Sequence, residues 1–215
     1  MDKESEHTTP SVRATYDRIA EHFAKTRAYP WPETEAFLAD REGAVGLDIG
    51  CGNGRHTELL AAGCDRAVGF DVSREILGTA RRRVRDSEAS FALVQADAAA
   101  LPVGTDCADL AVYVATLGHL PTRERRLASL DELGRVLRTD GRALVSAWAT
   151  EHDRFDAETG FDTTVPWTLP GGEEVDRFYH VYDPAEFRTD VTDSGLDLVE
   201  CWLSSGNCYA VVGSG

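Results

Sequence analysis

The sequence predicts an open α/β sheet with a ligand site at the carboxyl ends of its strands. An apolar run at 44–50 leads into glycines at 50, 52 and 54, and a helical pattern follows at 55–62. A strand that turns into a helix through glycines leaves backbone N–H groups unpaired near the helix N-terminus, where a ligand can bind. Strand and helix patterns then alternate along the chain, which is typical of this fold class.

Three aspartates support the same site. Asp48 lies within the first predicted strand, Asp71 ends the second, and Asp97 follows the third. Ligands of open α/β sheets bind outside the carboxyl ends of the strands, so acids at three such ends indicate one shared site. Asp71 also follows the glycine loop by about 20 residues, where a carboxylate commonly binds a ribose diol.

The spacing of the glycines separates two kinds of ligand. Dinucleotide-binding loops have the pattern G-x-G-x-x-G, whereas this loop has G-x-G-x-G with Asp48 two residues before the first glycine. That carboxylate disfavours an anionic pyrophosphate and favours a ligand with an ammonium and a sulfonium group. A glycine turn in some other α/β domain is the alternative for the loop alone, and the two further acids argue against it.

The composition indicates one globular domain with an acidic surface. The chain has 215 residues, of which 42% are hydrophobic, and a formal net charge of −15. Lys3 and Lys25 are its only lysines, which suggests adaptation to concentrated salt. A chain adapted to ordinary salt is the alternative. Because salt screens the attraction of phosphates, the negative charge does not exclude an RNA substrate.

The cysteines and the N-terminus indicate the environment of the chain. Five cysteines without a C-x-x-C pair predict reduced thiols and no metal site in this chain. The polar segment 1–10 lacks the pattern of a signal peptide, and no apolar run is long enough to span a bilayer. We therefore expect a cytoplasmic protein that does not enter a membrane.

Hydrophobic periodicity predicts the order of the remaining elements. A polar loop is expected at 151–174. The arginine run at 81–85 is expected to stabilise the C-terminus of a helix, with contact to RNA phosphates as the alternative. Helices are expected at 10–28, 33–40, 73–85, 122–137 and 183–194, and strands at 66–72, 91–95, 109–115, 141–149, 177–182, 196–203 and 208–212.

Segments along nearly the whole chain match the motifs of a known family. They are Tyr16–Ala20, His22-Phe23, Thr26-Arg27, Pro30–Pro32, Leu47–Arg55, Gly118–Leu120, Thr122–Arg126, Val165–Trp167, Arg177–Tyr182 and Asn207–Tyr209. The chain resembles the class I S-adenosylmethionine-dependent methyltransferases, and among them the tRNA wobble-uridine carboxymethyl methyltransferases. It departs from that family at Gly118, where a second histidine is common, and at Cys208, where a tryptophan is common.

The resemblance implies a fold and an activity. The expected fold is Rossmann-like, with a seven-stranded, mostly parallel sheet, an antiparallel C-terminal hairpin and an N-terminal helical cap. The chain 1–215 is then a single domain with the cap at 1–42, the cofactor-binding core at 43–150 and a substrate-side segment at 151–215. The expected reaction transfers a methyl group to the carboxylate of 5-carboxymethyluridine in the tRNA anticodon loop and forms a methyl ester.

The resemblance also implies roles for individual residues. His119, Arg27 and Arg177 are expected to bind the substrate carboxylate, its base or a phosphate. Structural roles are the alternatives: a turn residue for His119, a surface ion pair for Arg177, and packing for Trp31 and Tyr179. Expected substrate contacts are Trp31, Trp167, Tyr179 and Asn207. Expected S-adenosylmethionine contacts are Tyr16, Arg27, Asp48, Gly50, Cys51, Gly52, Asp71, Val72, Ala96, Asp97, Ala98 and Ala115.

The family works as a heterodimer with a small zinc-binding activator protein that pairs with an edge strand. In the usual strand order the third strand is an edge, and 91–95 has neither a proline nor a charge to block pairing. Phe91, Leu93 and Val94 are therefore expected to contact the activator.

The sequence leaves three alternatives to the function of a tRNA methyltransferase. One is a methyltransferase of the same fold that acts on a small molecule without RNA. Another is a cofactor-binding subunit of a translation complex that lacks turnover, which the complete set of acids with His119 argues against. A nicotinamide dehydrogenase fits least, because the loop lacks the G-x-G-x-x-G spacing.

Overall fold

The structure is a computed structural model that describes residues 7–86, 89 and 91–215. Its helices are α1 (Thr9–Lys25), α2 (Pro32–Leu38), α3 (Arg55–Gly63), α4 (Arg74–Asp86), α5 (Arg123–Val136) and α6 (Pro184–Asp193), with a 3-10 turn at Leu117–His119. Its strands are β1 (Gly43–Ile49), β2 (Cys64–Asp71), β3 (Ala92–Gln95), β4 (Ala108–Val114), β5 (Leu137–Trp148), β6 (Phe161–Thr168), β7 (Glu174–Val181), β8 (Asp197–Ser204) and β9 (Asn207–Gly213).

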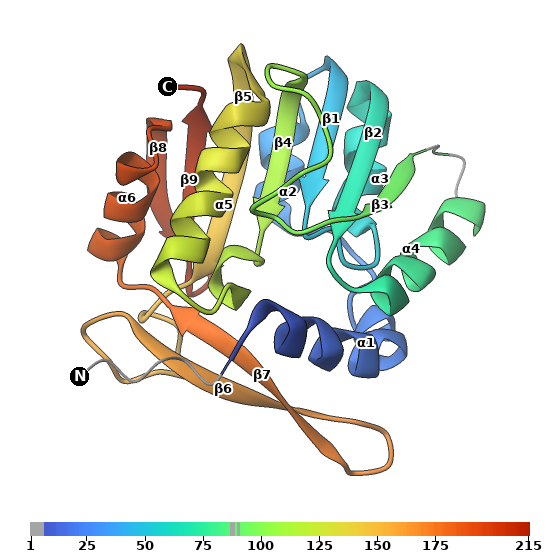
Figure 1. The fold of residues 1–215 in the computed structure, drawn as a ribbon, viewed down its shortest axis with the longest axis vertical. Helices are drawn as coiled ribbons and strands as arrows, with labels where there is room; N and C mark the ends of the chain where they lie inside the picture. The colour runs from blue at the N-terminus through green and yellow to red at the C-terminus, as the bar shows by residue number, and fades with distance from the viewer. Residues whose placement is uncertain (1–6, 87–88, 90) are drawn as a thin grey trace.

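The described residues form a seven-stranded sheet in the order β3-β2-β1-β4-β5-β9-β8 (Figure 1). The strands from β3 to β5 are parallel to one another. β9 is antiparallel to both β5 and β8, and β8 and β9 form the C-terminal hairpin. The predicted fold class is therefore confirmed.

Helices cover both faces of the sheet, and one helix covers its functional end. α2 and α3 pack on one face through Phe37 and Leu60, and α5 and α6 pack on the other through Leu130 and Phe187. α1 lies across the carboxyl ends of the strands, next to α4 and β7 (Figure 1). The buried Ile19 anchors it in a cluster that α4 and β7 share. The predicted helical cap therefore lies over the expected ligand site.

Local capping explains where the helices beside the site begin. Thr8 Oγ1 accepts a hydrogen bond from the backbone N–H of Ser11, and Pro10 fits the first turn of α1. Thr122 Oγ1 accepts from the backbone N–H of Arg125 and begins α5 as predicted. β5 starts at Leu137, earlier than the predicted 141–149, because residues 137–140 continue the strand rather than forming a turn.

The segment 151–174 differs from the polar loop that we expected. β6 lies within it and pairs antiparallel with β7, so these strands form a separate two-stranded sheet. Along β6 the buried Val165 lies between the exposed Thr164 and Pro166, which is the alternation of a half-buried strand. Pro166 is tolerated there because β6 pairs on one side only.

β3 is an edge strand, as predicted, but its apolar side chains point into the protein. Phe91 is 8% exposed and packs against Gly54, where a Cβ would lie 3.3 Å from its ring. Leu93 and Val94 are half-buried and pack against the two clusters on opposite faces of the sheet. Phe91 is thus a core residue, which corrects its assignment as a partner contact. The exposed side chains of this edge are Ala92 and Gln95.

In the part of the chain that the structure describes, no helix combines the length and the apolar composition needed to cross a bilayer.

Candidate active site

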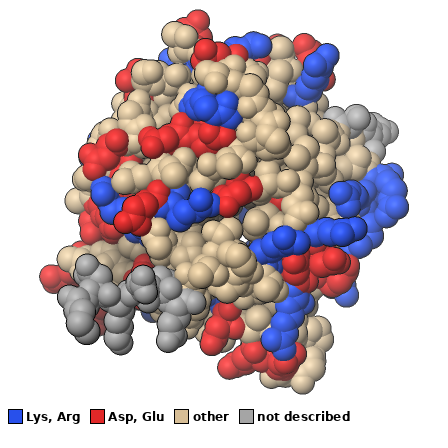
Figure 2. Space-filling view, in the orientation of Figure 1, with Lys and Arg blue, Asp and Glu red and all other residues tan. Residues whose placement is uncertain are grey.

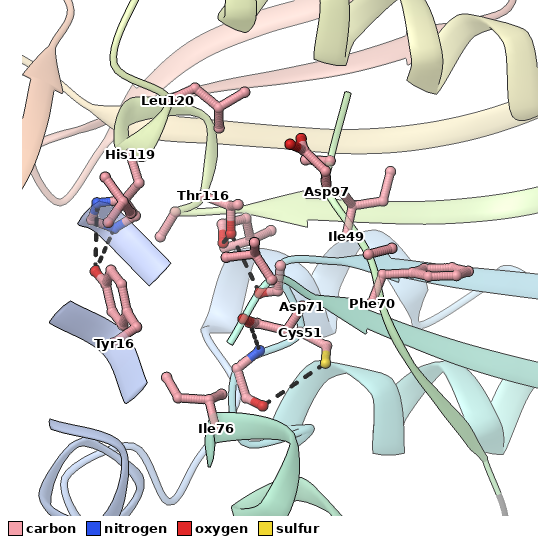
Figure 3. Close-up of a pocket in the computed structure, with 18 of the residues that line it drawn as sticks. Tyr16, Ile49, Cys51, Phe70, Asp71, Ile76, Asp97, Thr116, His119 and Leu120 are labelled. Carbon is pink, nitrogen blue, oxygen red and sulfur yellow. Dashed lines mark hydrogen bonds between the residues drawn. The ribbon is translucent and has the colours of Figure 1, made fainter. Parts of the chain in front are cut away.

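The glycine loop between β1 and α3 lines a pocket at the carboxyl end of the sheet (Figure 3). Gly50, Gly52 and Gly54 have φ angles of 72°, 57° and 80°, which side chains with a Cβ rarely adopt. A Cβ at Gly50 would lie 2.1 Å from Oγ1 of Thr116, which follows β4. The loop backbone therefore approaches the neighbouring strand end closely and remains open toward the pocket.

Asp71, at the end of β2, fixes the glycine loop. Its Oδ2 accepts a hydrogen bond from the backbone N–H of Gly52 at 3.0 Å, and its Oδ1 accepts one from Ser73 at 2.8 Å. Burial raises the pKa of Asp71 to about 6, although these backbone hydrogen bonds oppose the shift. A carboxylate has further lone pairs, so Asp71 can also accept hydroxyl groups of a ligand. The predicted cofactor contacts that line this pocket are Tyr16, Gly50, Cys51, Gly52, Asp71, Val72, Ala96, Asp97, Ala98 and Ala115.

Of the other two predicted acids, Asp97 lines the pocket and Asp48 does not. Asp97 lines the pocket and forms an ion pair with Arg125 at the start of α5. Asp48 is 1% exposed and lies outside the pocket lining, with its Oδ2 accepting a hydrogen bond from Thr57 Oγ1 at 2.6 Å. Burial raises the pKa of Asp48 to about 7. Asp48 therefore links β1 to α3 beneath the loop, which corrects the direct ligand contact that we expected.

A second pocket adjoins the first. Tyr16 and His119 line both pockets, and Figure 3 shows them facing one another beside the first. The side chains that line the second pocket but not the first include four predicted site residues from different elements: Arg27, Trp31, Arg177 and Tyr179. Trp148, for which no role was predicted, lines it as well.

Three arginines converge on the second pocket: Arg27, Arg55 and Arg177. Among the described residues, none of the three forms an ion pair with a carboxylate. Arg177 is 5% exposed, and its Nε has no hydrogen-bond partner in this part of the chain. Burial, followed by the charge of Arg27, lowers the pKa of Arg55 to about 10. Because a buried charge is unfavourable without a counter-charge, this pocket is suited to an anionic ligand.

His119 is held by the protein on both ring nitrogens. Its Nδ1 is 2.9 Å from the carbonyl oxygen of Phe178, and its Nε2 is 2.8 Å from the hydroxyl of Tyr16. A carbonyl only accepts, so we assign the proton to Nδ1, and Nε2 accepts from Tyr16. Burial lowers the pKa of His119 to about 4, so the ring is neutral at pH 7. His119 therefore orients Tyr16, and the direct bond to substrate that we expected stays a prediction for a residue that lines both pockets.

Three other predicted substrate contacts have protein side chains around them that leave little room for a substrate. Tyr179 is 9% exposed and stacks on Trp148 with ring centroids 4.4 Å apart, so it has no free face for a base. Its hydroxyl instead accepts a hydrogen bond from Arg177 at 2.7 Å. The ring of Trp167 lies 4.7 Å from the Arg177 guanidinium and outside the lining of both pockets. Asn207 is buried in the β8–β9 hairpin, also outside both linings.

Three residues without a predicted role complete the second pocket or hold its side chains in place. Arg55 lines it directly. Asn53 Nδ2 donates to the backbone oxygen of Arg27 at 2.8 Å, and His56 Nε2 accepts from the backbone N–H of Trp31 at 3.3 Å. The glycine loop thus holds Arg27, and the first turn of α3 holds Trp31, beside the pocket. The sequence signal for these residues was the G-N-G-R stretch at 52–55, in which Asn53 lies between two glycines and Arg55 follows the second.

Known proteins of similar sequence identify the family. Residues 47–141 match a family described as a methyltransferase domain. A methyltransferase of Encephalitozoon cuniculi is 32% identical over 222 residues, covering 99% of this chain and 99% of its own length. The chain belongs to the S-adenosylmethionine-dependent methyltransferases. The matched region contains the glycine loop, Asp71 and Asp97, which are the groups that build the first pocket of this methyltransferase.

Other relatives carry a more specific name. The tRNA (carboxymethyluridine(34)-5-O)-methyltransferase of Saccharomyces cerevisiae is 35% identical over 179 residues, covering 79% of this chain and 59% of that protein. The protein with the same enzyme name from Macaca fascicularis is 38% identical over 147 residues, covering 66% of this chain. The match spans 20% of that longer protein.

Solved structures share the fold. The structure titled "DhpI-SAM-HEP complex" has a TM-score of 0.73 and 21% identity, covering 97% of this chain and 99% of its own. A complex of the Haloferax volcanii Trm112 methyltransferase activator with a methyltransferase has a TM-score of 0.71 and 18% identity, covering 94% of this chain and 97% of its own.

The first pocket fits S-adenosylmethionine, the cofactor of this family. The open glycine backbone accommodates a ligand that approaches closely, Asp71 provides acceptors for ribose hydroxyls, and Asp97 provides an acceptor for an exocyclic amine. Apolar side chains from β1, β2 and α4, including Ile49, Phe70 and Ile76, line the rest of the cavity and suit an adenine ring.

The raised pKa of Asp71 predicts a pH dependence of cofactor binding. Ribose hydroxyls bind the ionised carboxylate better, so affinity should fall as pH drops through the pKa of about 6 and Asp71 takes up a proton. We expect the Kd of S-adenosylmethionine, measured by calorimetry, to rise by up to about tenfold per pH unit below that value. Asp71→Asn should bind more weakly and lose this pH dependence. An unchanged pH profile in the variant would assign the effect to another group.

Proposed function

We propose that this methyltransferase esterifies the carboxylate of 5-carboxymethyluridine at the wobble position of tRNA. The observation that carries the proposal is the convergence of Arg27, Arg55 and Arg177, without carboxylate partners among the described residues, on a pocket that adjoins the cofactor pocket. A carboxylate bound there would lie next to the methyl donor. The names of the Saccharomyces cerevisiae and Macaca fascicularis relatives support a tRNA carboxymethyluridine as the group that carries it.

The second pocket is suited to this reaction because the nucleophile needs no activation. A carboxylate is ionised at pH 7 and can attack without giving up a proton. His119 is neutral and is occupied by Tyr16 and the Phe178 carbonyl, consistent with a site that does not use a strong base. When bound, S-adenosylmethionine supplies an electrophilic methyl group. The arginines hold the carboxylate, and positioning of this kind can supply up to about 7–11 kcal/mol of the barrier.

Individual residues take distinct parts in this proposal. Arg177 lines the pocket and supplies positive charge to the carboxylate, while its Nη1 donates to the Tyr179 hydroxyl. Arg27 and Arg55 bind the carboxylate or an adjacent phosphate. Trp31, which is half-buried on the wall of the pocket, packs against the base. His119 and Trp167 are positioning residues, since they act through Tyr16 and Arg177.

The experiment that tests the proposal compares substrates. Labelled S-adenosylmethionine is supplied with tRNA that contains 5-carboxymethyluridine, with the same tRNA that contains uridine, and with small carboxylic acids. The proposal expects labelling of the first substrate alone. Labelling of small acids without labelling of tRNA would favour the alternative, a small-molecule methyltransferase of the same fold.

We further propose that a small zinc-binding activator pairs with the β3 edge in a heterodimer. β3 is short and lies at the edge of the sheet, and its outer backbone groups are available for strand addition. A structural neighbour is itself a methyltransferase in complex with the Trm112 activator, although that likeness concerns the fold.

The exposed side chains of β3 allow a test that leaves the core intact. Ala92→Lys places a charge on the edge, which blunts strand addition, and it leaves in place the hydrogen bond that Gln95 Nε2 donates to the backbone oxygen of Val72. We expect at least a tenfold loss of activator in co-purification, with an unchanged melting temperature of the isolated chain. Full recovery of the activator with this variant would show that it binds elsewhere.

Two further proposals concern the compartment in which the enzyme acts and the salt concentration there. A tRNA substrate implies that it acts in the cytoplasm. We also propose that the charge of −15 with two lysines is an adaptation to a salt-rich cell, as in halophilic archaea. A melting temperature that does not rise between dilute and concentrated KCl would contradict the salt proposal.

A further inference from the structure

Positive charge is concentrated on one part of this acidic chain. Although the net charge is −15, Figure 2 shows Lys and Arg side chains gathered over α4 and the adjoining part of α1. Lys25 ends α1. The residues of this surface, which we call the arginine surface, are Lys25, Arg81, Arg82, Arg83 and Arg85.

The arginine surface is connected to the substrate pocket through the turn at 26–29. Arg83 Nη2 donates to the backbone oxygen of Ala28 at 2.9 Å, and Arg55 Nη1 donates to that of Tyr29 at 3.2 Å. Arg27, on the same turn, lines the substrate pocket. Positive side chains therefore extend from the pocket across one turn of chain to Arg83, and from there Arg82 and then Arg81 and Arg85 follow around α4.

Two kinds of arginine make up this surface. Arg82 and Arg83 form ion pairs with Glu21 of α1 and Glu58 of α3, and so fix α4 to its neighbours. Arg81 and Arg85 are exposed and form no ion pair with a described carboxylate. Their i, i+4 spacing puts them on the same side of the helix, where their mutual repulsion is unfavourable. A helix C-terminus benefits from cations, but that benefit does not require several adjacent arginines.

We propose that the arginine surface binds the phosphate backbone of tRNA next to the nucleotide held in the substrate pocket. This inference rests on the proposed function and names the surface that receives the rest of the anticodon arm. RNA carries a phosphate at every nucleotide, so a strand that leaves the pocket needs a series of cationic contacts. Arginine suits this role because its planar fork binds phosphate oxygens through two hydrogen bonds.

The arginine surface also explains how a chain with a negative net charge could bind RNA, which is itself negatively charged. A chain of net charge −15 repels RNA as a whole, so binding requires local cations where the strand runs. A small carboxylic acid confined to the pocket gains nothing from Arg81 and Arg85 on the outer side of α4. The location of these side chains therefore favours a polyanion over a small acid.

The test compares two double variants with the same loss of charge. Arg81→Gln with Arg85→Gln removes the two unpaired arginines of the surface. Arg66→Gln with Arg188→Gln removes two exposed arginines from β2 and α6, outside the surface. The Kd for fluorescently labelled tRNA bearing 5-carboxymethyluridine is measured by fluorescence anisotropy over a series of KCl concentrations, with the Kd of S-adenosylmethionine as a second readout.

The proposal expects Arg81→Gln/Arg85→Gln to raise the Kd about five- to tenfold and to reduce the slope of log Kd against log salt by about 1.4, the value for two contacts to single-stranded RNA. The control variant should stay within twofold, and both variants should bind S-adenosylmethionine like the wild type. Equal effects of the two variants would overturn the proposal and indicate a general charge effect. Wild-type protein that fails to bind or methylate tRNA would instead overturn the proposed function, and this inference with it.

Discussion

Replacing Arg177 by methionine should lower kcat/KM for tRNA by about a hundredfold without changing the Kd of S-adenosylmethionine. Methionine keeps much of the volume between Trp167 and Tyr179 but removes the charge and the Nε donor that has no partner among the described residues. A charge-assisted hydrogen bond contributes about 1.5–3 kcal/mol, which corresponds to roughly ten- to hundredfold in rate. The measurement is steady-state methylation of tRNA, with calorimetry for the cofactor.

Two further variants separate charge from structure. Arg177→Lys keeps the charge without the planar fork and should recover part of the activity. Arg188→Met removes an exposed arginine of α6 and should behave like the wild type. If Arg177→Met methylated tRNA at the wild-type rate, the arginine pocket would not be the carboxylate site.

Replacing Gly50 by alanine should abolish detectable cofactor binding. The residue has a φ of 72°, and a Cβ would lie 2.1 Å and 2.3 Å from the Oγ1 and Cγ2 atoms of Thr116. A left-handed conformation costs a residue with a Cβ about 1–2 kcal/mol, and the collision must in addition displace the loop or the end of β4. We expect the Kd of S-adenosylmethionine to rise at least a hundredfold and the melting temperature to fall.

The chain offers matched glycine controls. Gly52 has a φ of 57°, but a Cβ there would meet only a ring carbon of Phe23, at 3.8 Å. Gly52→Ala should therefore show the backbone strain without the collision. Gly78, within α4, has no atom within 4 Å of an added Cβ, and its replacement by alanine should stabilise the helix by about 0.8–1 kcal/mol. Tight cofactor binding by Gly50→Ala would contradict the close approach of loop and strand.

The cofactor half of the site could be predicted from the sequence because its signals are local. The glycines, Asp71 and Asp97 each belong to one strand-to-loop junction, and parallel strands necessarily bring such junctions together. Asp48 shows the limit of that reasoning. The sequence places it beside the loop, but only the packing of Thr57 against it shows that the carboxylate faces the core.

The substrate half depended on long-range packing and was predicted less completely. Arg27, Arg177, Trp31 and Tyr179 do meet at one pocket. The burial of the Tyr179 ring against Trp148, however, depends on a contact between β5 and β7 that no local pattern encodes.

His119 and β6 illustrate two further physical limits on what the sequence predicts. The role of His119 depends on which groups meet its two nitrogens, and those groups come from α1 and β7. For β6, the alternation was present in the sequence, but polar residues and Pro166 obscured it, because a strand with one exposed face needs few apolar residues.

The most direct test of the central claim is to identify the product on tRNA. The enzyme, with the proposed activator, is incubated with S-adenosylmethionine and tRNA bearing 5-carboxymethyluridine, and the nucleosides are analysed by mass spectrometry before and after mild alkali. We predict that the wobble nucleoside gains one methyl group as an alkali-labile ester, and that Arg177→Met slows this gain by about a hundredfold. A methyl group that resists alkali, or that lies on another nucleoside, would contradict carboxylate methylation at the wobble position.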